Sequence, residues 1–212
     1  MTVTGSSVIP RYFPAIEKEK LLQYERFAAA LAGWNAKINL VSRKDINEVF
    51  IRHILHSLSI AKFIEFQPES RILDIGTGGG FPGIPLAILF PGCRFTLVDS
   101  MGKKIMAVKD MISVLELKNA EALQVRAEMV KEKFDFVLSR AVAPLPELWS
   151  LSRDHIHHKN RNRVANGILC LKGGDIQKEI RDLKRPVEII PVSNYFSEEF
   201  FRTKKIIYIP AG

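Results

Sequence analysis

The sequence lacks several features that mark specialised classes of protein. Only two cysteines occur in 212 residues, too few for the disulfide framework of a small secreted domain, so we expect Cys93 and Cys170 to be reduced core residues. The longest nearly apolar run, Ile84 to Phe90, is far too short to cross a bilayer. Met1 to Pro14 shows no signal-peptide pattern. We therefore expect a soluble, cytoplasmic protein without membrane contact.

Acidic residues are also missing from one stretch. Between His155 and Gly174 there is no Asp or Glu, although the whole chain carries 31 Lys and Arg against 23 Asp and Glu, a formal net charge of +8. Residues 155–163 read His-Ile-His-His-Lys-Asn-Arg-Asn-Arg. Such a run can collect phosphate groups by releasing their counterions, or it can be an ordinary solvated loop. Charge alone leaves both interpretations open.

Length and composition indicate one globular domain with an appendage. Hydrophobic residues make up 47% and charged residues 25% of the chain, which is ordinary globular usage and excludes a disordered protein. At roughly 150 residues per domain, the length suggests little more than one domain.

Two helices are predicted in the first 68 residues. Apolar side chains recur at the spacing of one helix face from residue 21 to 34: Leu21, Tyr24, Ala28, Leu31 and Trp34. Ser42-Arg-Lys-Asp45 resembles a capping box with Asp in place of Glu, so a second helix should follow it. Its stripe would be Ile46, Phe50, Ile54, Leu58 and Ala61. We therefore expect an N-terminal helical extension over residues 1–68.

From residue 69 to 212, short apolar runs alternate with helical stretches. Strands are predicted at 71–75, 94–98, 122–125, 134–139 and 168–171, and helices at 82–90, 103–117, 144–153 and 175–184. This alternation is typical of a parallel sheet covered by helices on both faces. Two further strands, 187–192 and 204–209, have no helix between them and predict an antiparallel hairpin. The expected fold class is α/β, Rossmann-like, with a mostly parallel sheet and an antiparallel C-terminal hairpin.

The most informative segment is the glycine-rich loop Leu73-Asp-Ile-Gly-Thr-Gly-Gly-Gly-Phe-Pro-Gly83. Glycines this dense between a strand and a helix, Gly76, Gly78 and Gly80 among them, indicate that a ligand approaches the backbone closely. Gly78-x-Gly80-x-x-Gly83 also spells the dinucleotide-binding fingerprint, which is weak evidence by itself.

Asp74 distinguishes between the nucleoside ligands that such a loop can hold. Beside a pyrophosphate its carboxylate would meet like charge, at a cost of about 4 kcal/mol for unit charges about 4 Å apart and an effective dielectric of about 20. S-adenosylmethionine carries an ammonium and a sulfonium and no phosphate, so it is favoured. Asp74 can also cap the amides of its own loop.

Two further segments follow predicted strands. Asp99 ends the second strand, where an acid can accept hydrogen bonds from both hydroxyls of a ribose, or can cap the next helix. Arg126-Ala-Glu128 follows the third strand, where the edge of an adenine would lie. Both features indicate a ligand that contains a nucleoside, but they do not distinguish S-adenosylmethionine from a dinucleotide.

Taken together, these motifs resemble the ribosomal RNA small subunit methyltransferase G family, also called glucose-inhibited division protein B. The segments that carry the resemblance are Trp34-Asn-Ala-Lys-Ile-Asn-Leu40, Arg52-His-Ile-Leu-His-Ser-Leu58, Gly76-Thr-Gly-Gly-Gly-Phe-Pro-Gly-Ile-Pro85, Leu97-Val-Asp-Ser100 with Gly102-Lys-Lys104, Ser139-Arg-Ala141 and Leu171-Lys-Gly173. They span most of the chain, and the Gly-Phe-Pro-Gly-Ile-Pro extension makes the match specific.

The resemblance implies a class I S-adenosylmethionine-dependent methyltransferase fold and methylation of N7 of one guanine in 16S ribosomal RNA. It further implies that the cofactor is contacted by Gly76, Phe81, Ala127, Glu128 and Arg140. The expected partner is 16S ribosomal RNA or the small ribosomal subunit, and the expected oligomeric state is a monomer. Arg140 could instead bind an RNA phosphate, or pair with Asp135 or Glu147, and Lys172 is a weaker candidate for phosphate contact.

The expected reaction requires no general base, because guanine N7 is an acceptor with a free lone pair. The fourth predicted strand ends in Ser139-Arg-Ala-Val-Ala-Pro144, not in the Asn/Asp-Pro-Pro-aromatic clamp of amino-group methyltransferases. We therefore assign no catalytic acid, base or nucleophile. His53 and His56 share a helix face, but a catalytic zinc takes three protein ligands and no third is visible, so no metal is expected.

Three other functions remain open on the sequence. A nicotinamide-dependent oxidoreductase would use the glycine fingerprint and Asp99, although Asp74 opposes it. A nucleic-acid-binding module could keep the fold and lose catalysis. An S-adenosylmethionine-dependent methyltransferase of a small molecule is the third alternative.

Overall fold

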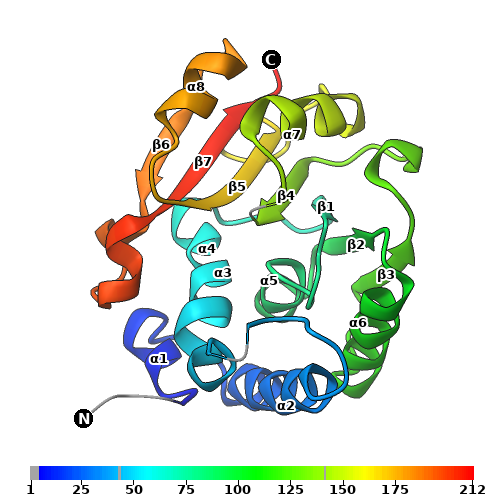
Figure 1. Ribbon diagram of the computed structural model, residues 1–212, viewed down its shortest axis with the longest axis vertical. Coiled ribbons are helices and arrows are strands. Elements are labelled where there is room, and N and C mark those ends of the chain that lie inside the picture. Colours follow the sequence, from blue (N-terminus) through cyan, green and yellow to red (C-terminus); the bar gives the residue numbers. More distant parts are fainter. Residues whose placement is uncertain (1–4, 43, 141) are drawn as a thin grey trace.

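The structure is a computed structural model that describes residues 5–42, 44–140 and 142–212. Arg43 and Ala141, which belong to two of the motifs above, lie outside the described residues, as do residues 1–4. The described chain forms one seven-stranded sheet with helices on both faces (Figure 1).

Five parallel strands form most of the sheet: β1 (Arg71–Ile75), β2 (Arg94–Asp99), β3 (Ala120–Gln124), β4 (Phe136–Arg140) and β5 (Gly167–Gly173). The strands β6 (Glu188–Pro191) and β7 (Lys204–Pro210) pair antiparallel, and β7 also runs antiparallel to β5. The order across the sheet is β3-β2-β1-β4-β5-β7-β6. This arrangement confirms the expected α/β fold, including the C-terminal hairpin.

Each strand contributes to two hydrophobic cores because successive side chains point to opposite faces. Ile72 of β1 belongs to the core under α5 (Gly83–Leu89) and α6 (Gly102–Val114), whereas Leu73 belongs to the core under α7 (Leu145–Ser152) and α8 (Gln177–Leu183). Both cysteines are buried, as expected: Cys93 in the first core and Cys170 in the second.

The N-terminal segment packs on the first of these two faces (Figure 1). It comprises α1 (Val8–Tyr12) and α2 (Lys18–Asn35), and α2 buries Tyr24, Phe27 and Leu31. The hydroxyl of Tyr24 donates to the carbonyl of Pro85 at 2.9 Å, which ties α2 to α5. The segment thus shares its core with the sheet, and the division at residue 68 stays a prediction.

The second predicted helix forms as consecutive helical segments, and the junction residues Val49 and Ser59 keep right-handed helical dihedral angles. The segments are a 3-10 turn (Ile46–Glu48), a π-helical turn (Phe50–Leu55), α3 (His56–Leu58) and α4 (Ile60–Phe63). Ser42 Oγ lies 2.7 Å from Asp45 Oδ2 and accepts a hydrogen bond from the Asp45 amide at 3.2 Å, so the capping interaction forms. The apolar spacing thus predicts the helix, whereas its 3-10 start and its π-helical widening leave no signal in that spacing.

The remaining short elements are 3-10 turns in the connections: Ala127–Met129, Arg153–His155, Val192–Asn194 and Glu199–Thr203. Among the described residues, no helix has the length and apolar character needed to cross a membrane.

Candidate functional site

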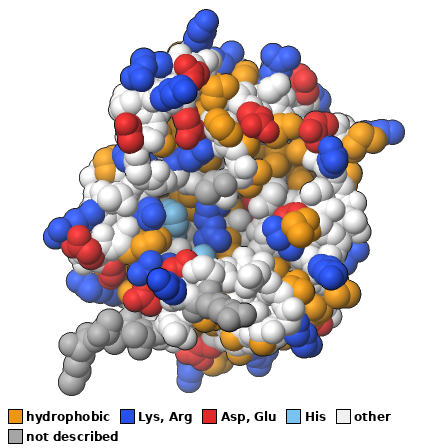
Figure 2. Space-filling model, viewed as in Figure 1, with side chains coloured by type: hydrophobic (Ala, Val, Ile, Leu, Met, Phe, Trp, Pro, Cys, Tyr) orange, Lys and Arg blue, Asp and Glu red, His pale blue; other side chains and the backbone are white. Residues whose placement is uncertain are grey.

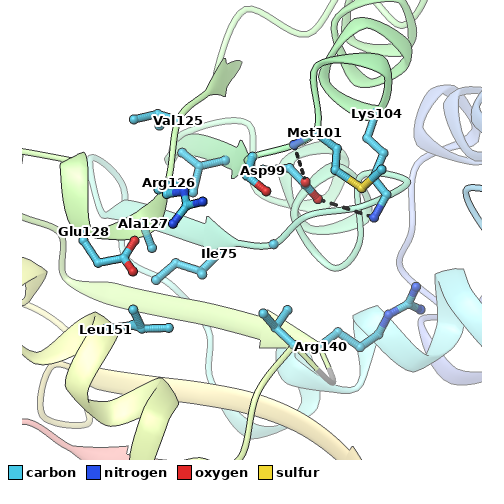
Figure 3. Close-up of a pocket in the computed structure, with 14 residues that line it drawn as sticks. Ile75, Asp99, Met101, Lys104, Val125, Arg126, Ala127, Glu128, Arg140 and Leu151 are labelled. Carbon is cyan, nitrogen blue, oxygen red and sulfur yellow. Dashed lines mark hydrogen bonds and ion pairs between the residues drawn. The ribbon is translucent and has the colours of Figure 1, made fainter.

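A cavity of about 540 Å³ opens at the carboxyl ends of β1, β2, β3 and β4, where ligands of open α/β sheets bind. Figure 2 shows this face hollowed near its centre, with Lys or Arg and His side chains in the hollow. The lining comes from four connections: Ile75 and Gly76, then Val98 to Met101 with Lys104, then Val125 to Glu128, and finally Arg140, Val142 and Leu151 (Figure 3).

The glycine loop bounds this cavity through Gly76. Gly76 adopts φ +67°, and a Cβ there would lie 2.5 Å from Cγ2 of Val142. Two separate constraints therefore require glycine at this position: the backbone conformation and the close approach of the chain after β4. The Gly76 amide donates to the carbonyl of Val98 at 2.9 Å and so joins the loop to β2.

Asp74 is fully buried beneath the loop and does not line the cavity. Its Oδ2 accepts hydrogen bonds from the Thr77 hydroxyl at 2.6 Å and from the Gly83 amide at 3.0 Å. Burial raises the pKa of this carboxyl to about 6, against the lowering effect of these two bonds. The capping interpretation of Asp74 is thus observed, and its contact with a cofactor stays a prediction.

Asp99 lines the cavity and organises both sides of it. Its Oδ2 accepts from the Gly78 amide at 3.1 Å, and its Oδ1 accepts from the Met101 amide at 2.9 Å, just before α6. The Lys104 ammonium lies 3.9 Å from the same carboxylate (Figure 3). Asp99 is therefore an acceptor beside the cavity that also holds the turn before α6, whereas the N-cap residue of that helix is Met101 and not Asp99.

Ala127 and Glu128 occupy the far end of the cavity. Figure 3 shows them on the connection after β3, opposite Leu151 of α7 and well separated from Arg140. The cavity is thus elongated, with the glycine loop and Asp99 between its two ends.

Arg140 ends β4 and extends toward the N-terminal helices (Figure 3). Its Nη1 donates to Nδ1 of His53 at 2.8 Å, and its guanidinium carbon lies 4.6 Å from the centre of the Phe81 ring. Burial lowers the pKa of this guanidinium to about 10, partly opposed by the charge of Asp74. Across the described chain no carboxylate lies within ion-pair distance of it, so the alternative pairing with Asp135 or Glu147 is wrong.

His53 is the functional neighbour that sequence reasoning missed. Since its Nδ1 accepts from an arginine, its proton resides on Nε2, which is buried and has no partner among the described residues. Burial and the charge of Arg140 lower the pKa of His53 to about 3, so the ring is neutral. The family motif Arg52-His-Ile contains this residue, but the spacing of His53 and His56 suggested no role except a metal ligand, and no metal was expected.

His56 does not join His53 in a ligand set. Its ring packs edge-on against Phe200 and Phe201. Within the described ranges, no group of three or more metal-ligating side chains is brought together.

Five of the nine predicted cofactor residues line the cavity: Gly76, Asp99, Ala127, Glu128 and Arg140. The other four lie behind this lining. Gly78 is bonded to Asp99, Gly80 (φ +86°) supports the turn into α5, Phe81 packs under Arg140, and Asp74 holds the loop. Lining residues that the sequence did not single out include Met101, Lys104 and Val142.

Lys172, the weaker candidate for phosphate contact, is engaged inside the protein. Its ammonium lies 2.9 Å from the Glu179 carboxylate and donates to the Ala143 carbonyl at 2.6 Å. The side chain is only 9% exposed, so it has no free donor surface for an RNA.

Comparison with known families gives a match over residues 19–207 to the family described as rRNA small subunit methyltransferase G. Relatives named ribosomal RNA small subunit methyltransferase G include one from Flavobacterium johnsoniae, 47% identical over 95% of this chain and 96% of its own length. Another, from Porphyromonas gingivalis, is 44% identical over 97% of this chain and 94% of its own length. These matches confirm the resemblance read from the motifs.

Solved structures share the fold at low identity. A precorrin-6y C5,15-methyltransferase from Geobacter metallireducens superposes with a TM-score of 0.55 at 13% identity, covering 81% of this chain and 90% of its own. Fibrillarin from Aeropyrum pernix, solved with S-adenosyl-L-methionine, gives 0.52 at 15% identity and covers 74% of each chain. These likenesses confirm the class I methyltransferase fold.

Proposed function

This chain belongs to the rRNA small subunit methyltransferase G family, and we propose that its cavity holds S-adenosylmethionine for transfer of a methyl group to N7 of one guanine in 16S ribosomal RNA. The observation that carries the proposal is the meeting of Gly76, Asp99, Glu128 and Arg140 around one elongated cavity. Its volume falls in the range of about 300–1,000 Å³ that small-molecule sites occupy. The oxidoreductase alternative is not favoured.

The lining suits the two ends of a nucleoside cofactor. The Asp99 carboxylate would accept hydrogen bonds from the ribose hydroxyls in the middle of the cavity. Ala127 and Glu128, at the far end, would lie against the adenine. The backbone at Gly76 admits close approach because no side chain occupies that place. Asp74, Gly78 and Gly80 would act indirectly, by holding the loop in its shape.

Arg140 is proposed to bind the carboxylate of the cofactor. A half-buried guanidinium without a carboxylate partner is a costly group, and an anionic oxygen would satisfy its remaining donors. The Phe81 ring and His53 hold its plane in place. A planar fork fixed in this way suits a carboxylate better than the flexible ammonium of a lysine would.

The chemistry demands alignment rather than acid–base catalysis. When bound, S-adenosylmethionine supplies a methyl group already activated by its sulfonium. The residues of this chain need only hold the acceptor nitrogen close to that carbon and exclude water, and such alignment can supply roughly 7–11 kcal/mol. Guanine N7 has no proton to lose, so the neutral, buried His53 has no proton to accept from the substrate and serves in positioning Arg140.

Transfer of a labelled methyl group to small ribosomal subunits from a strain lacking this gene tests the proposal. We expect label in 16S ribosomal RNA with the wild-type protein and a loss of about 10–100-fold with Asp99→Ala, since hydrogen bonds to charged groups contribute about 1.5–3 kcal/mol. The control is Asp110→Ala, which removes an exposed carboxylate of α6 that bonds Trp34 of α2 and does not line the cavity. Failure to label subunits or free 16S ribosomal RNA, despite tight cofactor binding, would exclude this substrate.

Three further features belong to the same proposal. With this substrate, we propose that the enzyme acts in the cytoplasm, where ribosomal subunits are assembled. We propose that it acts as a monomer, with residues 1–68 as an extension that covers the cofactor side of a methyltransferase domain at residues 69–212. Light scattering at working concentration, with and without RNA, tests the oligomeric state.

A further inference from the structure

The basic segment before β5 lies at the end of the sheet opposite to the cavity. Phe134 and Ile156 form an isolated parallel bridge, and the His157 amide donates to the Phe134 carbonyl at 2.8 Å. The Asn162 side chain accepts from the Gln67 amide at 2.8 Å and donates to Ser70 Oγ at 3.0 Å. These contacts fix the segment at the amino ends of β1 and β4. The cavity begins at the other end of β1, five residues away, or roughly 15 Å along the strand.

Asparagine side chains hold this segment in a defined shape. Asn166 is buried, and its Nδ2 donates to the carbonyls of His157 and Lys159 at 3.0 and 3.1 Å. Its amide donates to Oδ1 of Asn160 at 2.7 Å. Together with the bonds of Asn162, these contacts fold residues 157–166 against the sheet. A loop that is only exposed to solvent would not require these internal hydrogen bonds.

Three cations project from this fixed backbone: Lys159, Arg161 and Arg163, all of them exposed. Other arginines at the same end are neutralised, since Arg71 pairs with Glu132 at 2.8 Å and Arg94 with Glu69 at 3.1 Å. In the described part of the chain, none of the three has a carboxylate within 4.0 Å. The segment itself offers no carboxylate, since no Asp or Glu occurs from 155 to 174.

We propose that residues 157–163 form a second RNA-binding surface, the distal basic surface, which binds backbone phosphates of the ribosomal RNA away from the nucleotide that is methylated. The inference rests on the proposed function for its partner. Fixed, unpaired cations gain binding free energy by releasing counterions from phosphates, and they do so without reading sequence. The distance to the cavity means that a different nucleotide must occupy this surface. It would thus favour a large folded RNA over a small fragment as substrate.

The test is a triple substitution, Lys159→Gln, Arg161→Gln and Arg163→Gln, that leaves the three asparagines in place. Binding to 16S ribosomal RNA should weaken about tenfold near 0.15 M salt. Each lost phosphate contact should lower the slope of log affinity against log salt by about 0.7–0.9. KM for small subunits should rise about tenfold, with kcat and S-adenosylmethionine affinity unchanged.

A matched control removes three exposed cations elsewhere, with Lys178→Gln and Arg181→Gln in α8 and Lys109→Gln in α6. Equal losses in the two triple variants would show dependence on net charge alone and would overturn the proposal. Unchanged binding in the first variant would also overturn it. RNA binding is measured without methyl transfer. A wild-type protein that transfers no methyl group would therefore refute the proposed function, whereas the binding comparison would still decide whether the distal basic surface binds RNA.

The position of the contact is tested with Arg161→Cys carrying an iron chelate. Labelling is selective because Cys93 and Cys170 are buried. Radical cleavage of bound ribosomal RNA should fall outside the loop that contains the methylated guanine. Cleavage confined to that loop, or none above the level of a chelate placed at Lys178→Cys, would contradict a distal surface.

Discussion

Nη1 of Arg140 lies 2.8 Å from Nδ1 of His53, although the two residues are 87 positions apart in the chain. The bond joins the end of β4 to the π-helical turn of the N-terminal segment, and Phe81 of the glycine loop lies beneath the same guanidinium. Three separate parts of the chain thus set the direction of one cation at the edge of the cavity. The N-terminal segment is therefore part of the site as well as of the core.

Removal of the His53 acceptor should impair the site more than the fold. In His53→Leu the guanidinium loses its acceptor, and we expect about a 10–100-fold loss of cofactor affinity, since hydrogen bonds to charged groups contribute about 1.5–3 kcal/mol. His53→Asn keeps an acceptor oxygen and should recover much of the loss. Calorimetric titration with S-adenosylmethionine measures both. Equal affinities for His53→Leu and the wild type would show that the bond does not position Arg140.

Arg140→Met should make the protein more stable and less active. Burial lowers the pKa of Arg140 to about 10, which means that the folded state disfavours the charge, and an apolar side chain of similar length avoids this cost. We expect the free energy of unfolding to rise by roughly 1 kcal/mol, while methyl transfer falls at least about tenfold. Urea denaturation and a transfer assay give the two values. A variant both less stable and fully active would refute this account of Arg140.

Asp74 should make stability depend on pH between about 4 and 6. Its folded pKa of about 6 lies above the ordinary value of 3.8, so the folded state binds more protons in this window. The free energy of unfolding therefore falls as pH rises through it, by up to about 3 kcal/mol for this group. Asp74→Asn keeps an acceptor for Thr77 or Gly83, and its free energy of unfolding should not show this fall with pH. Parallel stability curves for the two proteins would contradict the raised pKa.

Comparing Gly76→Ala with Gly174→Ala distinguishes the cost of the left-handed backbone conformation from the cost of steric crowding in the loop. Gly76 and Gly174 have similar φ values, +67° and +74°, but a Cβ at Gly76 meets Val142 at 2.5 Å and one at Gly174 meets nothing within 4 Å. Gly174→Ala should therefore cost only about 1–2 kcal/mol of stability, the penalty for a left-handed alanine. Gly76→Ala should cost more and should also weaken cofactor binding. Thermal unfolding and titration of both variants measure the difference, and equal effects would remove Val142 from the explanation.

The sequence predicts the sheet and much of the cavity because strand–helix alternation is local information. The carboxyl ends of β1, β2, β3 and β4 necessarily meet at one edge, so Gly76, Asp99, Glu128 and Arg140 could be placed together from strand boundaries alone. The direction of the Arg140 side chain could not be predicted in this way, since its hydrogen-bond acceptor, His53, is distant in sequence. Asp74 lies below the lining because its Thr77 and Gly83 bonds turn it into the loop.

The place of the basic segment follows from topology that the sequence did contain. A connection that enters a parallel strand lies at its amino end, opposite to the crevice, and residues 155–163 precede β5. The charge pattern left phosphate contact and a solvated loop equally open, and only the contacts of Asn162 and Asn166 show that the segment is fixed. Polar bonds from asparagine side chains leave no periodic signal.

The most direct test of the central claim is the position of the methyl group in the cell. Ribosomal RNA from a strain lacking this gene, carrying either the wild-type gene or Asp99→Ala, would be treated so that the strand breaks at N7-methylguanine. We expect one break in 16S ribosomal RNA that depends on the wild-type gene and is lost or strongly reduced with Asp99→Ala. Identical break patterns with and without the gene would contradict the assignment of guanine N7 in 16S ribosomal RNA as the methyl acceptor.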